Sequence, residues 1–216
     1  MKRLLFASAA FSLCAGAAYA WDQTQFTLVP ANATILPCLA ADNVTPPVAT
    51  VVVNRGDLND TLAIHVTGLK PNLQFDLFTV QRSPFLADGS PDPDFPKTFG
   101  LAWYQSDLDA DDDGNAAIHF KRPLRSIFLD QIFGFDGDKN PDGTVILPPV
   151  NTYHVGFWFN NPADAANCGF NVSNPTPFNG EHQAGPLAMI SIPVAATNLG
   201  PLCLDPEEGT PCNPSH

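Results

Sequence analysis

The chain has 216 residues and carries 22 acidic against 10 basic side chains, for a formal net charge of −12. This balance argues against nucleic acid and anionic membrane surfaces as partners, and favours divalent cations, a cationic matrix or a solvated acidic surface. The length suits one domain, and 16 Phe, 3 Trp and 3 Tyr supply apolar area for a full core.

The first twenty residues have the layout of a secretory signal peptide. Lys2 and Arg3 precede an apolar run over residues 4–17, and a small-x-small triplet follows at 18–20. The run of about 14 residues is shorter than the ~20 of a membrane-spanning helix, and no later stretch reaches that length. We therefore expect cleavage after Ala20, a change in net charge from −12 to −14 through loss of two positive charges, and a secreted or periplasmic protein without a membrane span.

Four cysteines remain in the expected mature chain, and an even number in an exported protein indicates two disulfides with three possible connectivities. Cys203 and Cys212 flank a polar turn and are the easiest pair to close, so that Cys38 and Cys168 pair by elimination. A zinc site is the weaker alternative, because there is no C-x2-C spacing and no His stands near a Cys in sequence.

Short strand-like segments bounded by turn residues dominate the mature chain. They cover residues 24–29, 49–54, 61–67, 73–81, 99–105, 116–121, 126–133, 144–147, 152–160 and 187–194. Apolar and polar residues alternate in several of them, for example with Leu62, Ile64 and Val66 on one face. We predict an all-β fold, a single antiparallel β-sandwich of Ig-like or jelly-roll-like type, over residues 21–197, with 198–216 as a C-terminal extension pinned by its own disulfide.

Two segments that connect predicted strands have recognisable sequence patterns. Residues 161–168 predict one short helix, with Asn161 as the N-cap, Pro162 at the first position, Asp164 in the first turn and Gly169 at the end. Residues 83–97 contain four prolines without periodicity, which indicates either a long ordered loop or a flexible flap.

Two acidic loops match the first six positions of the calcium-loop pattern D-x-[DN]-x-[DN]-G. Their ligand candidates are Asp109, Asp111 and Asp113 in one loop and Asp138, Asn140 and Asp142 in the other. The bidentate Glu of an EF-hand is missing from both, so any Ca2+ site is a weak one of other design. The alternative is that both are hairpin turns, since Asp-Gly between strands is a strong turn signal.

Histidines offer two further hypotheses. His65, His119 and His154 fall on the expected polar faces of their strands, where a copper or zinc site is conceivable, although exposed single histidines are the ordinary interpretation. Separately, Glu181 and His182 could join Asp164 and His154 in an acid/base cluster, with an ordinary loop as the alternative.

Three stretches carry a resemblance to a group of secreted bacterial proteins without an assigned function: residues 99–107, 153–165 and 176–185. The resemblance begins near residue 73 and covers roughly half of the mature chain. It implies a shared β-rich fold and export, and it implies that the short helix and the Glu181–His182 loop form a shared site or structural corner. No catalytic residue follows from it, and the acidic loop at 136–142 departs from the pattern.

The leading functional hypothesis is a non-enzymatic secreted or periplasmic binding or structural protein, with Ca2+ as a candidate stabilising ion. It follows from the strand-rich pattern, the disulfides and the absence of a nucleophile motif. The alternatives are a metal-dependent or acid/base enzyme using His154, Asp164, Glu181 and His182, and a subunit of a surface assembly. The extracellular ligand or protein partner is not identified by the sequence.

Overall fold

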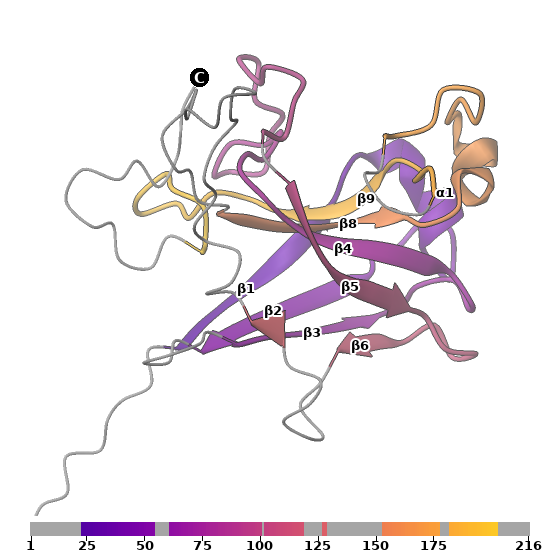
Figure 1. Ribbon diagram of the computed structural model, residues 1–216, viewed down its shortest axis with the longest axis horizontal. Helices are drawn as coiled ribbons and strands as arrows, with labels where there is room; N and C mark the ends of the chain where they lie inside the picture. Colours follow the sequence, from indigo (N-terminus) through magenta and orange to yellow (C-terminus); the bar gives the residue numbers. More distant parts are fainter. Residues whose placement is uncertain are drawn as a thin grey trace, which may run out of the picture.

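The computed structural model describes residues 23–54, 61–100, 102–118, 127–128, 153–177 and 182–202. Its elements are shown in Figure 1 and are β1 (Gln23–Pro30), η1 (Ala33–Ile35), α1 (Leu36–Leu39), β2 (Val48–Asn54), β3 (Thr61–Thr67), β4 (Gln74–Val80), β5 (Ala102–Asp109), β6 (Ala116–Ile118), β7 (Ile127–Phe128), β8 (His154–Phe159), η2 (Pro162–Cys168) and β9 (Leu187–Ser191). The expected signal peptide lies outside the described residues.

The strands form one continuous antiparallel sheet in the order β5-β4-β8-β9-β1-β2-β3-β6, with β7 pairing β3 beside this path. The two end strands, β5 and β6, follow one another in the chain and are joined by a tight turn in which Ala110 pairs with Ala116. This turn brings the ends of the sheet together, so the sheet curls into a nearly closed eight-stranded barrel (Figure 1). The all-β antiparallel class is confirmed, while the described strands make a single curled sheet in place of the two sheets expected of a sandwich.

The barrel interior is built from alternating residues of each strand. On β2 and β3 the inward residues pair directly, Val51 with Ile64 and Val53 with Leu62, and all four are buried. The predicted apolar face of residues 62, 64 and 66 is therefore confirmed. Each such side chain contributes roughly 1.5–3 kcal/mol of stability by leaving water.

The short helix predicted at 161–168 is confirmed as η2, a 3-10 helix. The side-chain oxygen of Asn161 accepts a hydrogen bond from the Ala163 amide, and Gly169 ends the helix with φ of 86°. Two further short helical elements, η1 and α1, lie between β1 and β2. Asn32 starts them by accepting a hydrogen bond from the Ile35 amide at 3.0 Å.

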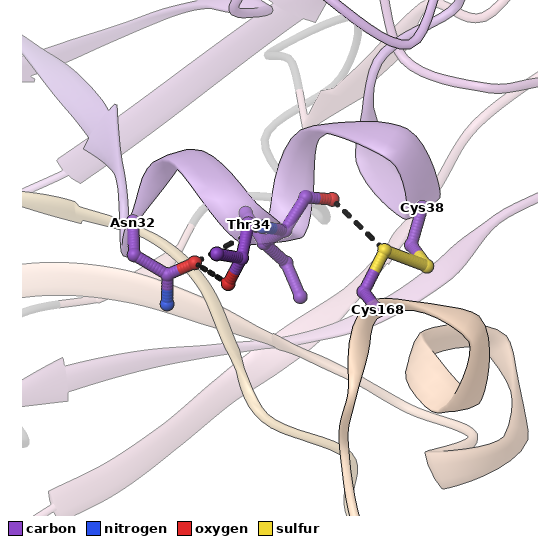
Figure 2. The surroundings of a disulfide bond; sticks show 5 residues. Asn32, Thr34, Cys38 and Cys168 are labelled. Atoms are coloured by element: carbon purple, nitrogen blue, oxygen red, sulfur yellow. Dashed lines mark hydrogen bonds between the residues drawn. A yellow bond between two sulfur atoms is a disulfide. The ribbon is translucent and has the colours of Figure 1, made fainter.

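One disulfide joins these helical turns, as the sequence predicts. Cys38 of α1 is bonded to Cys168 of η2 across 130 residues of sequence, and the Cys168 sulfur lies 3.7 Å from the carbonyl oxygen of Ile35 (Figure 2). Asn32 and Thr34 hydrogen-bond to each other at the start of the same turn. Cys203 and Cys212 lie outside the described residues, as does most of the expected C-terminal extension.

The loop between β4 and β5 covers part of the outer face of the sheet. Its two ends are tied together where the amides of Gln81 and Arg82 both donate to the carbonyl oxygen of Phe99. The Phe99 ring then packs edge-on against Trp158 of β8, with 5.1 Å between ring centroids. Within residues 83–97, Phe85 and Pro91 form an isolated β-bridge, and the Leu86 amide donates to the Ser90 carbonyl oxygen.

Candidate functional site on the outer face

Asp76 is a carboxylate with no solvent exposure, placed in the middle of β4. Its neighbours in sequence, Phe75 and Leu77, belong to the barrel core, so alternation directs Asp76 to the outer face of the sheet. There it lies between Asp107 of β5 and Trp158 of β8 in the strand register. A buried carboxylate is costly unless hydrogen bonds compensate it, so its partners are the key to this site.

Both partners come from the two ends of the long connection between β8 and β9. Asn160 donates from its side-chain nitrogen to Asp76 Oδ1 at 3.1 Å, and His182 Nε2 lies 3.0 Å from Asp76 Oδ2. Since a carboxylate only accepts, Nε2 is the protonated nitrogen of the His182 ring in this pair. The His182 side chain is 34% exposed. It therefore contacts both the buried carboxylate and solvent.

A second hydrogen-bonded pair lies beside the first on β5. The Tyr104 hydroxyl donates to Asp107 Oδ1 at 2.6 Å, and the Tyr104 ring packs edge-on against Phe78. Partial burial, the bond to Asp107 and the charges of Asp107, Asp76 and Asp109 all raise the pKa of Tyr104. The phenol therefore stays protonated and lies in a strongly negative environment. We call Asp76, Tyr104, Asp107, Asn160 and His182 the outer-face cluster.

A β-bulge shapes this part of β5. Leu77 is opposite Ser106 but Phe78 is opposite Tyr104, so Gln105 is the extra residue. Its side-chain nitrogen donates to the Thr79 hydroxyl at 3.1 Å. Bulges re-aim the side chains on either side of them, and this one sets Tyr104 within reach of Asp107, three positions along the strand.

His154, which the sequence places in the same cluster as His182, has different partners. It is 1% exposed, and its Nδ1 lies 3.1 Å from the hydroxyl oxygen of Ser191. Burial lowers the pKa of His154 to about 4, against a smaller raising effect of the Ser191 backbone. Along β8, His154 is four residues from Trp158, the neighbour of Asp76, which is roughly 13 Å at the usual rise of a strand.

The remaining two members of the predicted acid/base cluster are Asp164 and Glu181. Asp164 lies in the first turn of η2, where partial burial raises the pKa of its carboxyl. Glu181 lies outside the described residues. Of the three predicted residues that the structure describes, His182 is the one in the outer-face cluster.

The three-histidine hypothesis places its members on the outer faces of their strands. His154 is on the outer face of β8, but this face is covered there and His154 is buried. His65 is exposed on β3, and three strands separate β3 from β8 in the sheet. His119 lies outside the described residues.

The first acidic loop has the hydrogen bonds of a turn. Asp111 Oδ1 accepts from the amides of Asp113 at 3.0 Å and Asn115 at 2.8 Å. Gly114 has φ of 75°, and a Cβ there would lie 2.1 Å from the carbonyl oxygen of Leu69, so glycine is required. Asp138, Asn140 and Asp142 lie outside the described residues. In the part of the chain that the structure describes, no three His, Cys, Asp or Glu side chains are grouped to hold a metal ion.

The sequence contains a signal for this site that periodicity alone does not reveal. Asp76 interrupts the strand QFDLFTV, in which most other residues are buried. A charged residue in such a segment needs a dedicated partner. That partner is His182, which lies 106 residues further along the chain, so the local sequence does not identify it.

The helices in the described residues are too short to cross a membrane. Comparisons of the chain with known protein families, with curated proteins and with solved structures found no match.

Proposed function

We propose that this protein is a non-enzymatic binding protein of the secreted or periplasmic compartment, and that its outer-face cluster receives a positively charged group of the ligand. The observation that carries the proposal is the position of Tyr104. Tyr104 is 40% exposed, and the carboxylates of Asp107, Asp76 and Asp109 all act on its hydroxyl. An aromatic face beside carboxylates attracts ammonium and guanidinium groups through the ring quadrupole and through direct charge attraction.

Export is supported by two features of different kinds. The leader-like residues 1–20 predict secretion, and the Cys38–Cys168 disulfide is of the kind that persists in oxidising compartments. The acidic net charge of −12 adds a long-range attraction for cationic ligands. The buried carboxylate of Asp76 contributes a fixed negative potential without being offered to solvent itself.

The test is a titration of the mature protein with an acetylated tri-arginine peptide, followed by NMR. We expect shifts centred on Tyr104 and Asp107, and about 5-fold weaker binding in Asp107→Asn, equivalent to ~1 kcal/mol. The matched control is Asp112→Asn, which removes the same charge from an exposed position in the β5–β6 turn. Equal weakening in the two variants would show only non-specific charge attraction and would overturn the proposal.

A second candidate is acid/base catalysis, favoured by the pairing of His182 with a buried carboxylate. An imidazole held by a carboxylate through one nitrogen has the arrangement of a general base. Hydrolysis of p-nitrophenyl acetate tests it: catalysis requires activity that falls in both His182→Ala and Asp76→Asn but persists in His65→Ala. Activity unchanged in the first two variants removes this candidate.

Calcium binding by the two acidic loops stays a prediction. In the first loop Asp111 already serves the turn with one oxygen. The second oxygen of Asp111, together with Asp109 and Asp113, is what a Ca2+ ion would use.

A further inference from the structure

The connection between β8 and β9 links the disulfide to the outer-face cluster. It leaves the barrel at Asn160, runs through η2 to Cys168, and returns through His182. We propose that the Cys38–Cys168 disulfide is a redox control on the outer-face cluster: reduction releases this connection, and His182 then leaves Asp76. The effect on a ligand rests on the proposed function, whereas the movement of His182 does not.

The connection between β8 and β9 is a long loop that is held in place at its base and at its far end. At its base, the Gly185 amide donates to the carbonyl oxygen of Phe159 at 2.6 Å, and Thr176 and Ala184 exchange two backbone hydrogen bonds. At its far end, the anchors are the disulfide and the contacts of η2 with α1 and η1. Figure 1 shows η2 beside α1 and away from the loop that covers β8.

The helical part depends on the disulfide because it is short. A 3-10 helix of seven residues, as in η2, is not stable alone and needs tertiary contacts. Ala165 is the buried residue of η2, and the disulfide adds its covalent attachment to α1. Without the disulfide, the loop gains conformational freedom between Asn160 and the Thr176–Ala184 bridge, and the His182 contact must be kept by hydrogen bonds alone.

The reaction is a thiol–disulfide exchange with an external dithiol. One thiolate of the dithiol attacks the sulfur of Cys168, which is half-buried whereas Cys38 is buried, and Cys38 leaves as a thiolate. The second thiolate of the reagent then attacks the mixed disulfide and releases Cys168. Two electrons pass from the reagent, which becomes a disulfide, to the protein, which takes up two protons and holds two thiols.

The experiment compares Cys38→Ser/Cys168→Ser with a matched control, Cys203→Ser/Cys212→Ser, which also removes two cysteines. The readout is the ring nitrogen spectrum of His182, assigned with His182→Gln, together with hydrogen exchange of the Gly185 amide. We expect the first variant to give a His182 ring with averaged tautomers and at least ~10-fold faster exchange at Gly185, while the control resembles the natural protein. Identical His182 spectra in the two variants would overturn the proposal.

A second measurement covers the case in which the first variant does not fold. The control variant, which keeps only Cys38 and Cys168 in the mature chain, is reduced with dithiothreitol and followed by NMR. The expected order is a change at His182 while the Val51 and Ile64 amides of the barrel stay protected. Simultaneous loss of the protection of these amides would show general unfolding and would overturn the proposal.

The tri-arginine peptide, added to oxidised and reduced protein, reports separately on the ligand. Absence of binding to the oxidised form counts against the proposed function alone.

Discussion

His154 and Ser191 form a buried pair between β8 and β9, in which Nδ1 of the imidazole lies 3.1 Å from the serine hydroxyl. The Val155 amide donates to the same hydroxyl oxygen, and the Ser83 hydroxyl donates to the Ser191 carbonyl oxygen at 2.8 Å. The serine hydrogen is then available to the neutral form of His154. Protonation of Nδ1 would require this hydrogen bond to reverse its direction inside a buried site.

The first prediction concerns acid stability and follows from this pair. Burial lowers the pKa of His154 from 6.5 to about 4. Between these values the unfolded chain binds the proton and the folded chain does not, so stability is complete above pH 6.5 and declines as the pH falls toward 4. The loss amounts to at most about 3 kcal/mol. Urea unfolding across this range measures it, and His154→Gln should flatten the slope. An unchanged slope in this variant would contradict the prediction.

The elements that the sequence predicts best are those governed by local chemistry. η2 was predictable because Asn161, Pro162 and Gly169 are cap and end signals that act within a few residues. The strand at 61–67 was predictable from its alternation and coincides with β3. The Cys38–Cys168 pair followed by elimination, because Cys203 and Cys212 are close in sequence and the easiest pair to close.

The structure differs from the sequence-based prediction where contacts between residues far apart in the chain determine the local structure. β5 was expected at 99–105 and lies at Ala102–Asp109, because pairing with β4 keeps Asp107 and Asp109 in a strand although aspartate usually favours turns. The β5–β6 turn has a local signal, the Asp113-Gly114 pair, but barrel closure also depends on sheet curvature, which has none. His154 was expected on a polar face, but the residues that cover it, including Gly200, are far along the chain.

The second prediction concerns the Asp76–His182 pair. His182→Ala should lower the free energy of unfolding by about 1–2 kcal/mol, because it leaves the buried carboxylate with the Asn160 amide as its other side-chain donor. Asp76→Asn should cost a similar amount, and the double variant less than the sum of the two. A double-mutant cycle by urea unfolding gives the coupling, expected near ~1 kcal/mol. Additive effects would show that the two side chains do not interact in solution.

The third prediction concerns Gly156, over which the Trp158 ring lies. A Cβ at this position would be 3.1 Å from Ile190 Cγ1 and from the Met189 carbonyl oxygen, and 3.2 Å from Trp158 Cζ3. Gly156→Ala should therefore displace the indole and cost about 1–3 kcal/mol, with a changed near-ultraviolet circular dichroism spectrum. Adding Trp158→Phe should recover part of the loss. An unchanged spectrum in Gly156→Ala would contradict this packing.

The last prediction separates the two interpretations of the first acidic loop. As a turn cap, Asp111 needs only an acceptor oxygen, so Asp111→Asn should retain most of the stability, whereas Asp111→Ala should lose about 1 kcal/mol with or without metal. As a Ca2+ ligand, Asp111 also supplies charge, and the natural protein should melt roughly 3–6 °C higher with calcium than with EDTA. Thermal melts in about 5 mM CaCl2, above the usual dissociation constants of weak extracellular sites, measure both at matched ionic strength. A calcium shift that Asp111→Asn abolishes assigns the ion to this loop, one that survives it points to residues 138–142, and equal midpoints in calcium and EDTA leave Asp111 as a turn residue.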